Sequence, residues 1–575
     1  MFCSKNTSSQ GHYATLENKS EWQHLWDGKT WIVHTSENIS LADHKQTIIQ
    51  NFMNTTNSLY PGESSLMMNL SSSLNQNLKT EKFNPQMHMI QFPAQENLLP
   101  VFQSFHNFSQ KDLLSLQYNA LKNTHTVQNI EPNLYSPLYS RVPGPGLTSS
   151  IQMEDIIKSI GFDRALSSAL ASGVEFKPIY VAVIDTGVDS AHPYLRNSMY
   201  RSPEAPKPYY DLHGFDAAQT QEVGSSDLGG PGKACPLAPP TDPYSDYCGH
   251  GTHVAGIIAA KLYDTPGEGP QELGLCPSCQ IVSVRVVEKI QRPPTADFTD
   301  GYEVDGMIPD SAQIKAYQYL LNTPRPGEIN KPLPHIINMS FGKSFRSLAL
   351  ERLIQSLQDK GVIIVAAAGN ENSQAPSYPA AFPNVISVCA TTEPNPSQPN
   401  QYQKTYFSNY GYWVSLCAPG ENIESLSPGE RMRVHQGTSQ AAPFISGSIG
   451  FLQSINPDKT PKEIIGMLLR GANSKVLYDS TPAYGRTYQG GAQYALLGTG
   501  YLDVFASMYD NDQSEFAGTA YTEKSSSMVT SGGCISSVTQ NTWGGFFSSM
   551  PLMLIMAYLI LRSHSCWKFI KRNQS

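Results

Sequence analysis

The sequence has few charged residues and no strong excess of either sign. Only 15% of its 575 residues are Asp, Glu, Lys or Arg, and the formal net charge is −8. Proteins that bind nucleic acid usually carry a basic face. No block of Lys and Arg large enough to form such a face occurs before the extreme C-terminus. The composition therefore argues against a nucleic-acid partner. Because 40% of the residues are hydrophobic, the chain can bury large cores, and extensive disorder is not expected.

The first 30 residues are polar and lack the apolar stretch of a secretory signal peptide. Taken alone, this absence would indicate the cytoplasm. The other end of the chain conflicts with it, because residues 545–561 carry no charge and precede a basic flank that starts at Arg562. This run is at the short end for a transmembrane helix, and its flank places the tail in the cytoplasm and the main body outside. We therefore expect a secreted or membrane-associated protein of the cell envelope whose true start lies upstream.

Cysteine is also scarce, with nine in the whole chain, but six of them lie between residues 235 and 417 in three close pairs. An even, clustered set is typical of disulfides formed in an oxidising compartment. Reduced, inert thiols are the alternative. The six candidates are Cys235, Cys248, Cys276, Cys279, Cys389 and Cys417.

Composition divides the chain into regions that differ in polarity, in Pro and Gly content and in the secondary structure they are expected to form. Segment 31–135 alternates strand-like pieces (TWIVHT, MHMIQF) with helical ones, one of which has Ser40 as its expected N-cap, as in a small α+β module. A Pro/Gly-rich stretch follows and is typical of an exposed linker. A polar Ser/Thr/Gly-rich spacer precedes the C-terminal tail. The expected regions are 1–30, 31–135, 136–150, 151–507, 508–533 and 534–575.

The largest region, 151–507, alternates helical segments with short, almost continuously apolar runs. Such runs are typical of parallel strands buried on both faces, and their alternation with helices predicts a doubly wound, mainly parallel α/β sheet. These sheets bind ligands at the carboxyl ends of their strands. The predicted strands are 179–185, 281–287, 335–340, 361–368, 384–390 and 413–418.

Asp185 and His250 are two candidate site residues. Asp185 ends the first predicted strand, where Gly187 permits a tight turn; a simple turn cap is the alternative. His250 is flanked by glycines at the start of a helix, which would expose its imidazole at a cleft. A packed core histidine or a zinc pair with His253 are the alternatives, but an HExxH site needs i, i+4 spacing and a Glu. His253 is therefore expected to pack.

Ser439 and Asn370 complete the candidate set. Ser439 follows Gly437 at a predicted helix N-terminus, where free N–H groups and the helix dipole favour a developing anion; a plain N-cap is the alternative. Asn370 follows a strand-like run, and its amide could donate to an oxyanion. A turn residue after Gly369 is the alternative reading of this asparagine.

Taken together, these residues and their surroundings resemble the subtilisin-like serine proteases, the subtilase family. The matching motifs are DTGVD, HGTHVAG, AAAGNE and GTSQAAP, in the Asp–His–Ser order known for subtilisin. Further matches are NMSFG, YPAAFPNVISV, FSNYG, APG and GTGYLDV. The resemblance covers residues 179 to about 505.

The resemblance implies a serine endopeptidase that hydrolyses proteins through an acyl-enzyme. His250 would take the proton of Ser439, Asp185 would fix the imidazole, and Asn370 with the Ser439 N–H would hold the oxyanion. A membrane-tethered pseudoprotease or binding module with the same fold is the rival function. The segment that should pair with an extended substrate is Ser340, Phe341 and Gly342.

Some features depart from the family pattern. Subtilases often have HPDL after the Asp motif, with a carboxylate that helps to bind calcium, whereas Tyr194 stands in that place here. No cofactor is expected for catalysis, and a structural calcium is doubtful. Cys235–Cys248 would brace a long loop over the site. Cys276 and Cys279 could close a small loop, with zinc or redox chemistry as the weaker alternative, and Cys389 could pair with Cys417 because both end strands.

Both ends of the chain extend the resemblance. Residues 31–135 resemble an inhibitory propeptide of the inhibitor-nine type, with TWIVHT near its start and VQNIEPN near its end. Such a module would assist folding and block the cleft until self-cleavage within about residues 134–150. The tail resembles a bacterial sorting signal cut by a processing protease; an ordinary membrane anchor is the alternative. Its short motif is Gly532, Gly533 and Cys534.

Overall fold

The computed structural model describes residues 14, 26–36, 40–93, 98, 102, 110–124, 126–138, 153–201, 214–216, 246, 249–261, 274–289, 306–392, 402–429, 431–473, 477–478 and 496–509. All of them belong to the first of two compact units, Met1–Ser525. The predicted membrane span 545–561 and the motif at Gly532, Gly533 and Cys534 lie outside these ranges. Within them, no helix is both long and apolar enough to cross a bilayer.

A parallel sheet of seven strands forms the centre of the larger domain, in the order β16-β14-β13-β12-β5-β7-β6. All six predicted strands are present, most of them shorter than their apolar runs, so the predicted doubly wound α/β architecture is confirmed. The strands are β5 (Ile179–Asp185), β6 (Gly214–Asp216), β7 (Cys279–Arg285), β12 (Ile336–Met339), β13 (Ile363–Ala367), β14 (Ile386–Thr391) and β16 (Leu416–Pro419).

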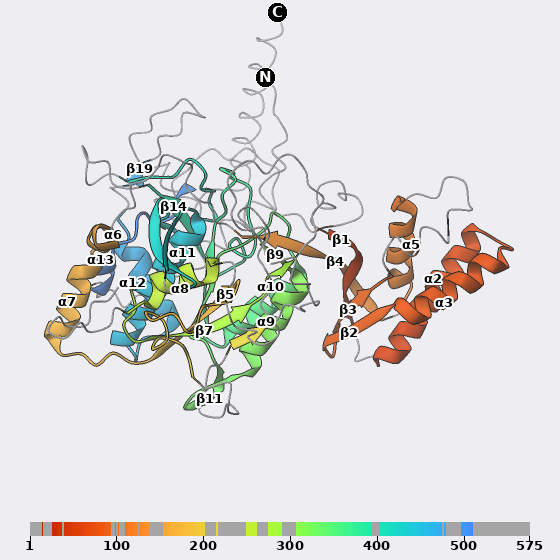
Figure 1. Ribbon diagram of the computed structural model, residues 1–575, viewed down its shortest axis with the longest axis horizontal. Coiled ribbons are helices and arrows are strands. Elements are labelled where there is room, and N and C mark those ends of the chain that lie inside the picture. Colours follow the sequence, from red (N-terminus) through yellow and green to blue (C-terminus); the bar gives the residue numbers. More distant parts are fainter. Residues whose placement is uncertain are drawn as a thin grey trace, which may run out of the picture. The chain divides into compact units, whose positions relative to one another are not determined.

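Helices cover both faces of this sheet (Figure 1). Alternate residues of β5 show the division: Val181 and Val183 join the core that contains α8 and α11, whereas Ala182 and Ile184 join the core that contains α9 and α10. Because helices bury both faces of the sheet, the strands need apolar residues on both sides and are apolar along almost their whole length. The helices are α6 (Met153–Ser159), α7 (Phe162–Ser172), α8 (His250–Ala259), α9 (Asp310–Asn322), α10 (Leu348–Asp359), α11 (Thr438–Ile455), α12 (Pro461–Gly471) and α13 (Val504–Met508).

Short strands decorate this domain. The β17–β18 hairpin leads into α11, and β9 leads into α9. Their bounds are β8 (Glu288–Lys289), β9 (Gly306–Pro309), β10 (Pro324–Arg325), β11 (Glu328–Pro332), β15 (Tyr402–Gln403), β17 (Ile423–Ser427), β18 (Arg431–His435) and β19 (Leu477–Tyr478).

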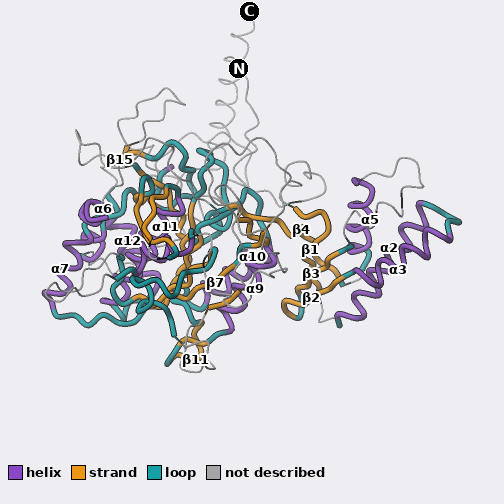
Figure 2. The backbone as a smooth tube through the Cα atoms, viewed as in Figure 1, coloured by secondary structure: helices purple, strands orange, loops and turns teal. Residues whose placement is uncertain are grey.

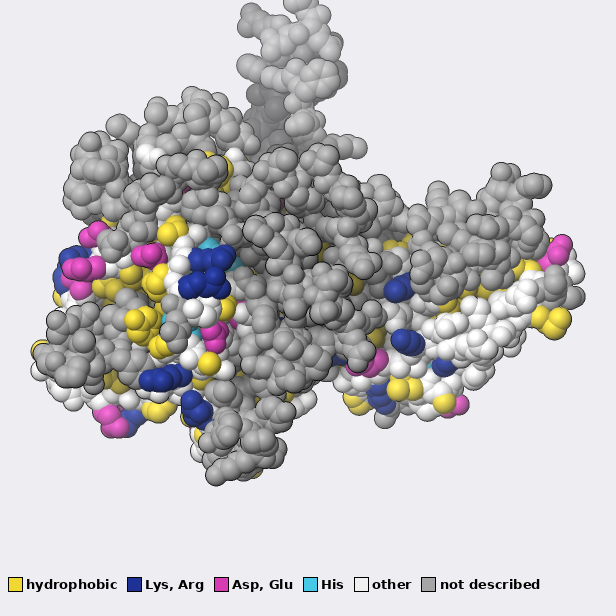
Figure 3. Space-filling view, viewed as in Figure 1, with side chains coloured by type: hydrophobic (Ala, Val, Ile, Leu, Met, Phe, Trp, Pro, Cys, Tyr) yellow, Lys and Arg dark blue, Asp and Glu magenta, His cyan; other side chains and the backbone are white. Residues whose placement is uncertain are grey.

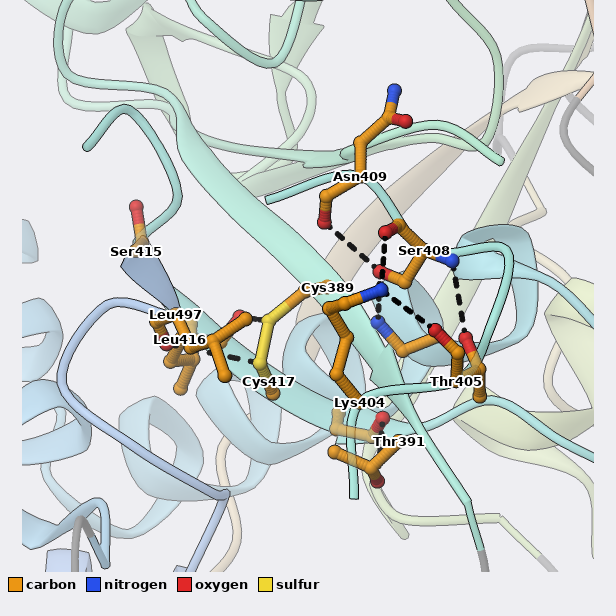
Figure 4. Close-up of a disulfide and its surroundings, with 12 residues drawn as sticks. Cys389, Thr391, Lys404, Thr405, Ser408, Asn409, Ser415, Leu416, Cys417 and Leu497 are labelled. Carbon is orange, nitrogen blue, oxygen red and sulfur yellow. Dashed lines mark hydrogen bonds between the residues drawn. A yellow bond between two sulfur atoms is a disulfide. The ribbon is translucent and has the colours of Figure 1, made fainter. Parts of the chain in front are cut away.

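Two of the three expected disulfides lie in described segments. Cys389–Cys417 joins the neighbouring strands β14 and β16 (Figure 4), and Cys276–Cys279 closes a small loop before β7. The small loop packs on α11 at Gly450, where an added Cβ would lie 2.6 Å from the Cys279 sulfur. In the structure this pair is a buried disulfide, so its sulfur atoms are not arranged as zinc ligands. The candidates Cys235 and Cys248 lie outside the described residues.

An N-terminal α+β layer precedes this domain, with its helices on one face of an antiparallel sheet (Figure 2). The expected N-cap is present, since the Ser40 hydroxyl accepts from Asp43 N at 3.1 Å. Strand β2 and helix α3 were not predicted. Helix α3 was missed because it is rich in Ser and Asn, which are weak helix formers. The elements are β1 (Trp26–Thr35), α2 (Leu41–Leu59), α3 (Ser64–Asn77), β2 (Lys79–Asn84), β3 (Met87–Gln91), α5 (Gln110–Lys122) and β4 (Val127–Pro137).

Two buried histidines in this layer make its stability sensitive to pH. His44 of α2 and His88 of β3 meet edge to face with ring centroids 5.0 Å apart, and both rings are buried. Burial lowers the pKa of both, to about 4 for His88, where the positive charges of His44 and Lys82 add to the effect and a backbone hydrogen bond at Pro85 opposes it.

We expect protonation to loosen the layer. In the unfolded layer these histidines bind protons from pH about 6.5 downward, whereas in the folded layer His88 resists protonation until the pH nears 4. The stability is therefore fully present above the unfolded pKa and is lost as the pH falls through this window. Hydrogen exchange of α2 and β3, corrected for intrinsic rates, should lose protection at pH 5 relative to pH 7, while β12 does not. A His88→Leu chain should show a much weaker loss; equal loss in both chains would show that another group titrates.

Candidate active site

Asp185 and His250 meet where the first strand ends and a helix begins. His250 Nδ1 lies 2.7 Å from Asp185 Oδ1, which also accepts from Thr186 N at 2.7 Å. Both side chains are fully buried. The approach requires glycine at position 251, because a Cβ there would lie 2.0 Å from the carbonyl oxygen of Gly187. A carboxylate at Nδ1 places the proton on that nitrogen and leaves Nε2 as the basic atom.

Asp246 holds this junction together and was not predicted. Its Oδ1 accepts from Thr186 Oγ1 and Gly249 N, both at 2.8 Å, and its Oδ2 accepts from Thr252 N and Oγ1 at 2.8 and 2.7 Å. Thr186 Oγ1 in turn accepts from Gly251 N at 2.9 Å. Burial raises the pKa of Asp246, and these donors oppose the rise. An Asp just before a glycine-bounded helix was the available signal, but it is also the ordinary signature of a cap.

Ser439 is the second residue of α11. Its hydroxyl donates to the backbone oxygen of Ser340 at 3.0 Å, and Ser340 Oγ donates back to the Ser439 carbonyl at 3.1 Å. His250 Nε2 has no hydrogen-bond partner in the described ranges. The structure therefore joins Asp185 to His250 directly but holds the serine hydroxyl on Ser340, so the hydroxyl must leave Ser340 before the imidazole can take its proton.

Asn370 lies three residues after β13 and is tied to the start of α11. Its Oδ1 accepts from both N and Oγ1 of Thr438 at 3.0 Å, and Thr438 Oγ1 accepts from Gly369 N at 3.0 Å. These bonds fix the amide plane beside the residue that precedes Ser439. Because Oδ1 is engaged as an acceptor, the Nδ2 group is the part of the side chain that could donate to a developing oxyanion.

His253 packs instead of binding metal. Its Nε2 lies 3.1 and 3.2 Å from the carbonyl oxygens of Ile423 and Arg433, and its ring stacks on His435 with centroids 4.5 Å apart. Burial, with the nearby charge of His250, lowers the pKa of His253 to about 3, so the ring is neutral and donates to those carbonyls. Nowhere in the described residues do three or more His, Cys, Asp or Glu gather as metal ligands.

The donors around Tyr194 do not fit a tight calcium site. Its backbone N donates to His192 Nδ1 at 3.2 Å, and the two rings lie 5.6 Å apart, so aromatic groups fill the place of the family's carboxylate.

In another part of this domain, the buried ammonium group of Lys404 donates hydrogen bonds to backbone oxygen atoms (Figure 4). Its Nζ donates to Thr405 O at 2.8 Å and Ser408 O at 3.0 Å, in a nearly fully buried position.

The expected substrate-binding segment carries an extended stretch of the chain itself. Gly342 N donates to Pro137 O at 3.2 Å, and Phe341 forms an antiparallel bridge with Leu138. On its other edge, this stretch pairs with β9, with Ser136 opposite Ile308. Strand β4 thus extends past the boundary at 135 that composition indicated, and residues 136–138 are paired rather than exposed linker.

Side chains next to this stretch bind the starts of α9 and α10. Glu131 Oε2 accepts from Leu348 N at 3.0 Å, in the first turn of α10. Asn133 Oδ1 accepts from Ser311 N at 2.8 Å, and its Nδ2 donates to Ser311 Oγ at 3.1 Å. His34 Nε2 lies 2.9 Å from Glu131 Oε1 and orients that carboxylate. Two helix N-termini, which favour acceptors and negative charge, thus receive groups from the N-terminal layer.

Comparison with known proteins adds to this geometry. A family model described as "Subtilase family" matches residues 177–492, more than half of the chain. The chain is 32% identical over 237 residues to subtilisin BL of Lederbergia lenta, which covers 41% of this chain and 74% of that protein. It is 29% identical over 309 residues to subtilisin amylosacchariticus of Bacillus subtilis subsp. amylosacchariticus, covering 53% of this chain. The match spans 63% of that relative, just under two thirds of its length.

A solved structure has the same fold. Fervidolysin from Fervidobacterium pennivorans, described as a keratinolytic enzyme related to subtilisin, superimposes with a TM-score of 0.52 at 19% identity. The match covers 87% of this chain and 63% of that one.

Proposed function

Because this chain belongs to the subtilase family, we propose that it is a serine endopeptidase that hydrolyses peptide bonds in proteins through an acyl-enzyme intermediate. The observation that carries the proposal is the buried 2.7 Å contact between His250 Nδ1 and Asp185 Oδ1 at the carboxyl edge of the sheet. It leaves His250 Nε2 as a base on the sheet face that α8 shares with the nucleophile helix α11. The rival, a pseudoprotease or binding module, would not require these groups to be intact.

The chemistry follows from the side chains. When a substrate N–H takes over the Ser340 carbonyl, the Ser439 hydroxyl loses its acceptor and turns to His250 Nε2, which removes its proton as the oxygen attacks the substrate carbonyl. Asn370 and the Ser439 N–H stabilise the oxyanion. His250 then protonates the leaving amine, and water releases the acyl group. No step of this chemistry needs a metal or a cofactor.

The N-terminal layer is proposed to be an inhibitory propeptide that the enzyme removes from itself. Support comes from the paired stretch that ends at Leu138 and from Glu131 and Asn133 at the helix starts. Residues 135–138 are paired with the peptidase domain, so cleavage is expected beyond them, within about residues 139–150.

Location and tail processing remain proposals. Disulfides in two described pairs support an extracytoplasmic location. A membrane-associated or secreted protein whose residues 534–575 serve as a sorting signal, cut by a processing protease, or as an anchor fits that location. The described side chains on the face in Figure 3 include both Lys or Arg and Asp or Glu.

A labelling experiment tests the proposed activity. The full chain, allowed to process itself, should react stoichiometrically with a fluorophosphonate and cleave a denatured protein substrate. Ser439→Ala should abolish both labelling and cleavage, with a loss of about 10⁴-fold or more in rate, and should leave the N-terminal layer attached. Ser356→Ala, on the outer side of α10, is the matched control and should retain full activity. Undiminished cleavage by Ser439→Ala would remove the proposal.

A further inference from the structure

Three side chains in or next to the paired stretch, residues 135–138, face the larger domain, which contains the seven-stranded sheet. Leu134, Ser136 and Leu138 are buried, whereas Tyr135 and Pro137 between them are only half-buried. This is the alternation of a strand that rests one face on a protein surface. The serine is the exception in an otherwise apolar row. A buried hydroxyl is costly unless it has a hydrogen-bond partner, so the surface beneath it is informative.

The surface beneath Ser136 is polar. Gln313 of α9 donates from Nε2 to Ser136 Oγ and to Asp310 Oδ1, each at 3.4 Å. Its Oε1 accepts from the Tyr317 hydroxyl at 3.3 Å, which also contacts Met339 Sδ at 3.0 Å. Gln313 and Tyr317 are both completely buried. Both ends of the amide are therefore engaged, and its orientation presents N–H donors to the peptide.

A buried ion pair closes the same surface. Asp310 follows the end of β9, Lys343 follows Gly342, and their side chains form a salt bridge at 1% and 2% exposure. The pair thus links β9 with the segment Phe341–Gly342, which lie on either side of the paired stretch. Burial raises the pKa of Asp310 to about 6, against the opposing charge of Lys343. We call Asp310, Gln313, Tyr317 and Lys343 the polar wall.

We propose that the polar wall is a specificity subsite that selects a small hydroxyl side chain, Ser or Thr, at the substrate position occupied here by Ser136. The proposal rests on the proposed function, because it takes residues 135–138 as the stand-in for a bound substrate. A leucine at that position would remove one of the two acceptors that Gln313 Nε2 has in the structure and would place an apolar side chain over a polar surface, whereas a hydroxyl supplies the acceptor. Gln313 is a specificity-determining residue, not a catalytic one.

Peptides copied from the chain test this directly. Internally quenched peptides of residues 133–143 would carry Ser, Thr, Ala or Leu at position 136, with enzyme concentration set by fluorophosphonate titration of the self-processed full chain. The kcat/KM for Ser and Thr should exceed that for Leu by about tenfold, a modest value suited to one long hydrogen bond. Gln313→Leu should abolish or reverse this ratio. Gln318→Leu, a half-buried glutamine on the same helix, should leave it unchanged.

Two outcomes would overturn the proposal: a wild-type preference for Leu, or an unchanged ratio in Gln313→Leu. A second measurement needs no activity. In the full chain with Ser439→Ala, the midpoint of thermal unfolding would be compared for Ser136→Ala, Gln313→Leu and the double variant. The shift caused by Ser136→Ala should shrink when Gln313 is already Leu; strictly additive shifts would also overturn it. Failure of fluorophosphonate labelling would refute the proposed function separately.

Discussion

The Asp185→Asn variant should lose about four orders of magnitude in kcat while remaining folded. Asp185 accepts from His250 Nδ1 and Thr186 N through a single oxygen. An asparagine of the same size can turn its NH2 group toward the imidazole, which then places its proton on Nε2. That nitrogen can no longer receive the proton of Ser439, so the nucleophile is not activated.

Kinetics on a protein substrate, together with the thermal unfolding midpoint, would measure the effect. Asp359→Asn, at the exposed end of α10, removes the same charge and should change kcat less than twofold, since surface substitutions rarely matter. A kcat within about tenfold of the wild-type value in Asp185→Asn would mean that another group orients His250.

The Asp246→Ala variant should be destabilised by roughly 3–5 kcal/mol, because several buried donors lose a shared acceptor. Thr186, Gly249 and Thr252 would keep their N–H or hydroxyl groups in a dry site with no partner. The start of α8 would shift with them, so His250 should leave its contact with Asp185 and kcat should fall together with stability.

Denaturant unfolding with parallel kinetics would test this prediction. Asp246→Asn should lie between wild type and Asp246→Ala, because one oxygen still accepts while the new NH2 opposes Thr252 N. Asp155→Ala, on the exposed side of α6, should stay within about 0.5 kcal/mol of wild type. A loss below about 1 kcal/mol in Asp246→Ala would show that water or another group can replace the carboxylate.

Local patterns in the sequence predicted much of this protein. The continuous apolar runs predicted the parallel strands, because a sheet covered on both faces has no polar side. The motifs made four site residues visible, because each of these residues ends a strand, closely follows one or starts a helix. They are Asp185, His250, Asn370 and Ser439. Helix α3 was missed because its Ser and Asn residues obscure the leucine spacing that buries it.

Other features depended on contacts between distant segments. Asp246 acts on Thr186, 60 residues earlier, and only the approach of α8 to the end of β5 brings them together. The composition of 136–138 indicated an exposed linker, yet strand β9 and the segment at Phe341, both far along the chain, pair with it. Pairing of this kind depends on partners that local composition does not report.

The sequence by itself determined the sheet, the subtilase motifs and the identity of the groups that could do the chemistry, because hydrophobic periodicity and motif spacing are local properties. Only the tertiary structure decided that Ser439 rests on Ser340, that Asp246 braces the histidine helix and that Ser136 meets a polar wall. Each of these depends on hydrogen bonds between segments roughly 60 to 180 residues apart, and chain order alone does not specify which donor will meet which acceptor.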